Sequence, residues 1–138
     1  MTNVHSGVNV DINDFAYVAE TGKAFDEAVV SVLKAAERKG WSLFQVYDLR
    51  ERLASKGFVQ EPLKVIEICN GRHANKILGR DRLASLCMPC RINVLEEGGK
   101  VRIASMRPAM MSQLFPGICQ EDVEDVEKEL REIVDSSI

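Results

Sequence analysis

The chain has 138 residues, of which 46% are hydrophobic and 28% are charged, and its formal net charge is −3. This length is typical of one domain, and the composition excludes collagen-like, mucin-like and intrinsically disordered proteins. The sequence contains no apolar run of about 18 residues, the length that a transmembrane helix needs. Residues 1–14 lack the basic region and apolar core of a signal peptide, so we expect a cytoplasmic protein without a membrane partner.

The charge is unevenly distributed along the chain. Residues 23–110 contain sixteen basic and ten acidic residues, a net charge of +6, whereas residues 111–138 contain two basic and eight acidic residues, a net charge of −6. A basic segment attracts anions and nucleic acids, but the acidic total and the single tryptophan, Trp41, argue against a dedicated nucleic-acid binder. The alternative is that the two charged segments face each other within the fold or across a dimer.

The N-terminal part of the chain predicts an arm, a strand and a long helix. Residues 1–13 are polar and predict a flexible arm, which leaves residues 14–138 as a single domain. A short strand is expected over 15–19. Residues 21–40 predict a long amphipathic helix, because apolar side chains recur at helical spacing, acidic residues occupy its first turn, and basic residues followed by glycine end it.

The middle of the chain alternates strands with short helices. Residues 41–47 predict a strand rich in aromatic side chains, and Asp48 is placed to cap a short helix after it. Residues 63–69 predict a β-branched strand, and Asn70 is placed to cap a second short helix.

The last third predicts a hairpin and a helix. A strand is expected over 86–95, with Pro89 marking an edge or a bulge because proline donates no hydrogen bond to a ladder. A tight turn at 96–99 leads to a returning strand over 100–106 and then to an amphipathic helix over 123–134. We therefore predict an α+β fold: a mostly antiparallel sheet of about four to six strands with one long N-terminal helix, short connecting helices and a C-terminal helix.

Three of the four cysteines form a pattern typical of a metal site. Cys69 is followed by His73, and after thirteen intervening residues Cys87 and Cys90 form a C-x-x-C motif. Thiolates and imidazole suit zinc, copper(I) or iron, and three cysteines with one histidine complete a tetrahedral zinc site. Under this hypothesis the metal ligands are Cys69, His73, Cys87 and Cys90.

The same thiols also suit redox chemistry or sulfur transfer. In that hypothesis Cys87 or Cys90 is the attacking thiolate, the other thiol resolves the intermediate, and Arg91 assists electrostatically, with a sulfur-carrier protein as a possible partner. A third alternative is that the cysteines pack as small apolar side chains, since a regular strand points Cys87 and Cys90 to opposite faces unless Pro89 forms a bulge.

Two further sets of residues are candidates for function. Glu67 lies in the middle of a strand, and if its face is buried it needs a cation or a proton, which makes it a candidate acid/base group. Polar and basic residues of the middle segment can gather around an anionic small molecule. The candidates are the amide of Asn70 and the guanidinium groups of Arg72 and Arg107, together with Arg80, Arg82 and Arg91. The alternative is a solvated face with salt bridges.

These residues favour a small binding module that handles thiols or metal, and the alternative is a non-catalytic module that binds an anionic small molecule or a partner protein through its basic middle. Whether the protein is an enzyme stays open.

Residues from about 15 to 117 resemble a family known as domain of unknown function 302. The resemblance rests on Val65 to Arg72, on Leu86 to Val94 with its proline and arginine, on the glycine pair of the hairpin turn, and on the step from Arg107 to Pro108. It implies a compact α+β domain similar to the TATA-box-binding-protein-like fold, often a homodimer, and no known reaction. It does not imply DNA binding, because a shared fold does not transfer function. Cys69 and Cys90 depart from the family pattern, so the thiols are not a general family site.

Overall fold

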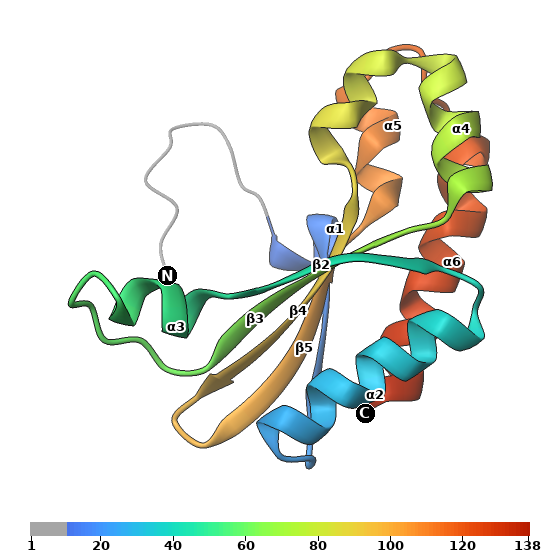
Figure 1. The fold of residues 1–138 in the computed structure, drawn as a ribbon. Helices are drawn as coiled ribbons and strands as arrows, with labels where there is room; N and C mark the ends of the chain where they lie inside the picture. The colour runs from blue at the N-terminus through green and yellow to red at the C-terminus, as the bar shows by residue number, and fades with distance from the viewer. Residues whose placement is uncertain (1–10) are drawn as a thin grey trace.

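The computed structural model describes residues 11–138 (Figure 1). Most of the arm predicted for residues 1–13 therefore lies outside the described residues. At its end, Asp11 accepts a hydrogen bond from the backbone N–H of Asn13 and begins a four-residue helix, α1 (Ile12–Phe15). The described chain thus begins with a short helix that was not predicted, and of the long helix predicted over 21–40 only Phe25–Arg38 is helical.

Five strands form one sheet in which every neighbouring pair is antiparallel, so the predicted α+β class and antiparallel sheet are confirmed. In the spatial order β1-β5-β4-β3-β2, the strands are β1 (Ala16–Thr21), β5 (Lys100–Met106), β4 (Cys90–Glu97), β3 (Leu63–Cys69) and β2 (Ser42–Asp48). The remaining helices are α2 (Phe25–Arg38), α3 (Leu49–Ala54), α4 (Gly71–Arg80), η1 (Arg82–Cys87), η2 (Pro108–Met110), α5 (Met111–Leu114) and α6 (Gln120–Ser137).

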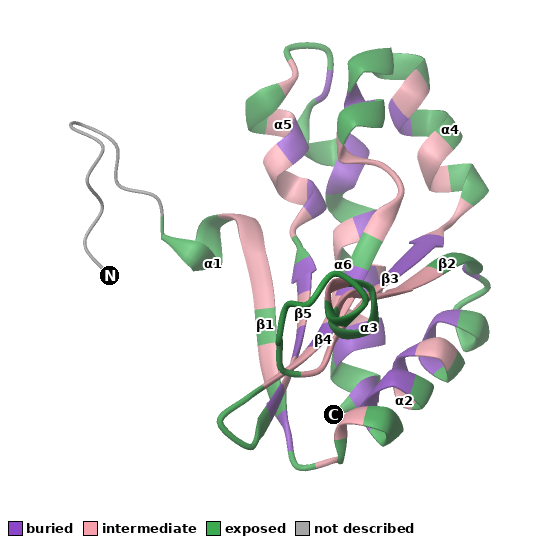
Figure 2. Ribbon diagram, turned by 60° about the vertical axis from the view of Figure 1, so that its left-hand side comes forward, coloured by how far each residue is buried: buried purple, intermediate pink, exposed green. Residues whose placement is uncertain are grey.

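Helices α2 and α6 pack against one face of the sheet (Figure 1). Strand side chains alternate between the two faces, and the residues that point toward these helices are apolar and fully buried, such as Ile66, Ile92, Val94 and Ile103. Each helix contributes an apolar stripe at helical spacing (Figure 2). The core of the protein therefore lies between the sheet and these two helices.

The opposite face of the sheet is partly exposed. Val18 of β1 and Met106 of β5 keep 39% and 42% of their surface accessible. Arg91 and Asn93 of β4 occupy the same face, because they alternate with the buried Ile92 and Val94. In the part of the chain that the structure describes, no helix is long and apolar enough to cross a membrane.

The segment before β4 differs from its prediction. Residues 82–87 form the 3-10 helix η1, and the strand begins at Cys90 instead of at residue 86. Pro89 explains this start, because it has no N–H to donate to the ladder. Cys87 and Cys90 consequently lie on different elements, and the objection that a regular strand would separate them does not apply.

Candidate functional site

A pocket of about 330 Å³ lies where β4 begins and β5 ends. Three connections shape it: the end of η1, the junction of α1 with β1, and the segment that leads from β5 into α5. Its walls are mostly apolar and include Phe15, Leu86, Pro89, Met106, Pro108 and Met111. Its polar groups come mainly from the C-x-x-C segment and from β4, namely Cys87, Cys90, Arg91 and Asn93.

Arg91 is positioned by an ion pair across two strands. The register places it opposite Glu67 of β3, and its Nε donates to Glu67 Oε2 at 3.2 Å. Half of the Arg91 side chain stays exposed. The guanidinium carries five N–H donors, so this single contact leaves most of its hydrogen-bonding capacity available at the pocket.

Glu67 is only 9% exposed, and both of its carboxylate oxygens are engaged. Oε2 accepts from Arg91, and Oε1 accepts from the Tyr47 hydroxyl at 3.0 Å. This hydrogen bond raises the pKa of Tyr47. Glu67 lies on the partly exposed face of the sheet, opposite Arg91, but its own side chain is buried, so the requirement for a cation or a proton applies to it. The carboxylate is nevertheless paired, and its visible role is to hold Arg91 and Tyr47 in place.

Asn93 lines the pocket and carries an unsatisfied polar atom. Within residues 11–138 its Oδ1 is buried and has no hydrogen-bond partner. A buried acceptor without a partner costs about 1–3 kcal/mol. Asn93 was not identified from the sequence, although a polar residue in the middle of a β-branched strand, between Ile92 and Val94, was a usable signal.

The two C-x-x-C thiols both line the pocket, but neither is activated. Burial, followed by negative charge on Cys69 and Cys87, raises the pKa of Cys90 to about 12, and Arg91 offsets only part of this rise. Burial also raises the pKa of Cys87 and that of Cys69. Because the thiolate is the nucleophile, these environments disfavour thiol chemistry at neutral pH.

A second cavity of about 20 Å³, room for about one water molecule, shares Pro89, Cys90 and Met111 with the first. Cys69, His73 and Cys90 line it, whereas Cys87 does not. The His73 ring is held by α6, because its Nε2 lies 2.7 Å from Glu129 Oε2. The predicted ligand set is therefore divided between two cavities. Among residues 11–138, no group of three or more His, Cys, Asp or Glu side chains is arranged to hold a metal ion.

Glu129 also accepts from Trp41 Nε1 at 3.0 Å. Burial alone would raise the pKa of Glu129, but the hydrogen bonds from Trp41 and His73 outweigh it and lower the pKa. His73 is therefore part of a polar contact between α4, the start of β2 and α6, and this contact accounts for its place in the fold.

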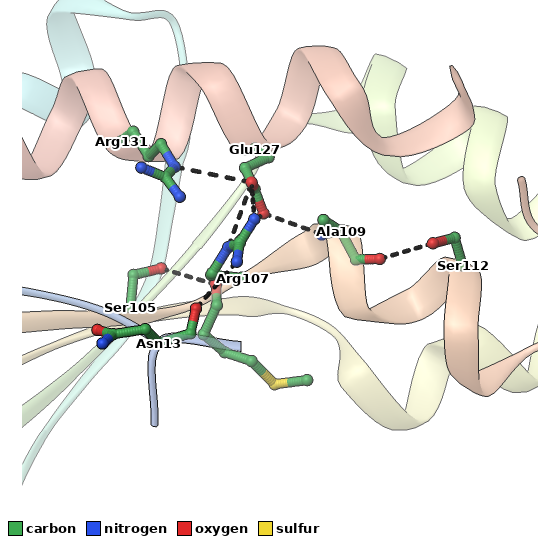
Figure 3. A network of polar contacts seen from close by, with 8 residues as sticks. Asn13, Ser105, Arg107, Ala109, Ser112, Glu127 and Arg131 are labelled. Atoms are coloured by element: carbon green, nitrogen blue, oxygen red, sulfur yellow. Dashed lines mark hydrogen bonds and ion pairs between the residues drawn. The ribbon is translucent and has the colours of Figure 1, made fainter. Parts of the chain in front are cut away.

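The residues predicted to bind an anionic ligand are not brought together. Asn70 caps α4 by accepting from the His73 N–H at 3.2 Å, as predicted, and Arg72 is exposed on the same helix. Arg107 Nη2 donates to Glu127 Oε2 of α6 at 2.8 Å (Figure 3). The charge of Arg107 is thus compensated within the fold.

The basic middle and the acidic C-terminal segment face each other within the chain. Basic groups of the middle segment pair with acidic side chains of α6 in three further places: Lys39 with Glu132, Arg80 with Asp122, and His73 with Glu129 if the imidazole is protonated. Part of the basic segment is therefore neutralised by α6 and is not free to attract a partner.

We expect the four thiols to react at different rates with iodoacetamide at pH 7.5. Cys119 is exposed and should be alkylated first, whereas Cys90, which is only partly exposed and has its pKa raised to about 12, should be alkylated last. Peptide mass spectrometry over a time course measures the order. Fast alkylation of Cys87 or Cys90 ahead of Cys119 would contradict it and would restore the thiol-chemistry hypothesis.

Residues 17–137 match the model of the family described as domain of unknown function DUF302. The fold is similar to a crystal structure of an uncharacterised conserved DUF302 protein from Bacillus stearothermophilus, with a TM-score of 0.83, 24% sequence identity, and coverage of 90% of this chain and 98% of that chain. No curated protein gives a significant match. At this identity the solved structure shows the fold alone, whereas the family match covers most of the chain. The chain belongs to the DUF302 family, as its sequence motifs indicated.

Proposed function

We propose that the protein binds a small, largely apolar molecule in the pocket where β4 begins and β5 ends, and that it is a binding module. The observation that carries the proposal is the pocket itself. Its volume of about 330 Å³ falls within the range of small-molecule sites, and it combines apolar walls with a few polar groups on one strand. Such a combination supports binding and orientation of a ligand.

The alternatives receive less support from the same residues. A thiol mechanism needs an activated thiolate, and the raised pKa values of Cys87 and Cys90 oppose it. Binding of an anionic partner through the basic middle needs free positive charge, and Arg107 and Arg80 are paired with α6. The thiols are better described as weakly polar parts of the pocket wall.

Two other expectations stay predictions. Binding of zinc, copper or iron is tested by the metal content of protein purified without a histidine tag. The homodimer that the family resemblance implied is tested by sedimentation equilibrium.

We expect Ala104→Trp to weaken binding of the neutral naphthalene dye prodan at least tenfold. Ala104 lines the pocket and lies opposite Asn93 on the partly exposed face of the sheet, so an indole there fills the pocket without entering the core. A strand accepts tryptophan readily, which preserves the fold. Prodan fluorescence at increasing protein concentration measures the affinity.

The matched control is Ala54→Trp, which adds the same side chain to an exposed position of α3 outside the pocket. It should bind prodan as the native protein does. Equal affinity in the native protein and in both variants, or no binding at all, would overturn the proposed function. Circular dichroism spectra and melting temperatures confirm that both variants are folded.

A further inference from the structure

We infer that the ligand of this pocket is a small carboxylic acid whose apolar body carries an O–H or N–H donor at the end away from the carboxylate. This inference rests on the proposed function and names the class of molecule that the pocket would take. It depends on two side chains of β4, Arg91 and Asn93, that line the pocket from the same face of the strand.

The donor is inferred from Asn93. Its Oδ1 is buried and has no partner within residues 11–138, so this oxygen can turn toward a ligand O–H or N–H without giving up a hydrogen bond. The side chain as a whole is only partly buried and borders the pocket. Rotation about its terminal bond exchanges the amide oxygen and nitrogen, and Oδ1 has no hydrogen bond to lose in that rotation. A donor on the ligand therefore forms a hydrogen bond to Oδ1 without breaking an existing hydrogen bond of that oxygen.

The carboxylate is inferred from Arg91. Its guanidinium is half exposed at the pocket and uses Nε for Glu67, while a planar guanidinium can bind a second carboxylate through its other N–H groups. Glu67, whose other oxygen accepts from Tyr47, holds the arginine, so the guanidinium is positioned before a ligand arrives. Prior positioning reduces the entropy lost on binding.

The spacing of these two groups sets the shape of the ligand. Residues two apart on one face of a strand lie about 7 Å from each other. A benzene ring with substituents at opposite positions spans a similar length and is flat and apolar. Phe15, Leu86 and Met106 supply apolar walls for such a ring. A hydroxyphenyl carboxylic acid is therefore a suitable probe of the inferred class.

Three probes compared by displacement of prodan from the native protein test the inference without any mutation. The first is 4-hydroxyphenylacetate, which has both groups. Phenylacetate lacks the donor, and 4-hydroxyphenylacetamide lacks the charge. We expect 4-hydroxyphenylacetate to displace prodan at concentrations about tenfold lower than either of the others, as one hydrogen bond or charge contact of about 1.4 kcal/mol requires.

Two variants assign the preference to the two side chains. Asn93→Leu should remove the preference over phenylacetate while keeping the preference over the amide, and Arg91→Gln should do the reverse. Glu67→Gln is the complementary control: it removes the charge that competes for Arg91, so affinity for the carboxylates should rise.

The outcomes separate this inference from the proposed function. If prodan binds in the pocket and the three probes displace it equally, the carboxylic-acid inference is wrong and the proposed function stands. If prodan does not bind, or Ala104→Trp leaves its binding unchanged, the proposed function itself is wrong. If the native preference persists in both Asn93→Leu and Arg91→Gln, the assignment to these residues is overturned.

Discussion

Replacing Glu127 by alanine is expected to lower the free energy of unfolding by about 3 kcal/mol at pH 7. The carboxylate receives hydrogen bonds from the Arg107 guanidinium and from the Ala109 N–H at 3.1 Å, and Arg131 lies 3.7 Å away (Figure 3). Arg107 Nη1 also donates to the Asn13 carbonyl at 2.9 Å. The substitution therefore leaves a largely buried arginine unpaired where α1, η2 and α6 meet.

Urea denaturation measures this loss, and Glu124→Ala, which removes an exposed glutamate from the same helix, is the control. The control should change the free energy of unfolding by less than about 0.5 kcal/mol. Equal effects of the two substitutions would contradict the role assigned to Glu127.

The effect of Glu127→Ala should shrink in acid. Burial alone would raise the pKa of Glu127, but the hydrogen bonds from Arg107 and Ala109 outweigh it and hold the pKa below its usual value. A carboxylate whose pKa is lower in the folded state contributes stability above its unfolded pKa, about 4.3, and loses that contribution as pH falls through the folded pKa. The difference between native protein and variant should therefore be smaller at pH 3 than at pH 7, and an unchanged difference would exclude this ionic contribution.

Ile92→Ala is expected to lower the free energy of unfolding by about 4 kcal/mol. Ile92 is 0% exposed and lies on β4, the middle strand of the sheet, on the face that α2 and α6 cover. Neighbours on two strands and on the helices cannot all move inward, so the substitution leaves a cavity in addition to the lost apolar burial.

The same urea measurement checks this result. An unchanged slope of the free energy of unfolding against urea concentration shows that the variant unfolds in the same transition as the native protein. Ile12→Ala removes the same atoms from a side chain that is 52% exposed, and its effect should stay below about 1 kcal/mol. A loss below 1 kcal/mol for Ile92→Ala as well would mean that this layer of the core is loosely packed.

Elements that depend on neighbouring residues were predictable from the sequence. The strands at 63–69 and 100–106 have the predicted bounds, and Asp48 and Asn70 cap the helices that follow them. The glycines at 98 and 99 adopt the positive φ angles that the predicted hairpin turn needs. These outcomes follow from alternation, side-chain capping and backbone freedom, all of which act within a few residues of the chain.

The candidate site was only partly predictable. The sequence singled out Cys87, Cys90 and Arg91, which line the pocket, but it also grouped Cys69 and His73 with the thiols. Spacing along the chain does not show that His73 turns to Glu129, which lies 56 residues later. The acidic C-terminal segment was recognised as a possible internal partner for the basic middle, but the individual pairs depend on how α6 crosses the other elements.

The sequence by itself determined the order of the five strands and of the helices α2, α3, α4 and α6, the antiparallel α+β class and the family, because local patterns and short motifs carry that information. The tertiary structure alone decided that Asn93 lines a pocket and carries an unpaired oxygen, that Glu67 holds Arg91 beside it, and that burial raises the pKa values of Cys69, Cys87 and Cys90. Burial, pairing and cavities are properties of segments far apart in the chain, and they exist only once the sheet, η1 and α6 have packed together.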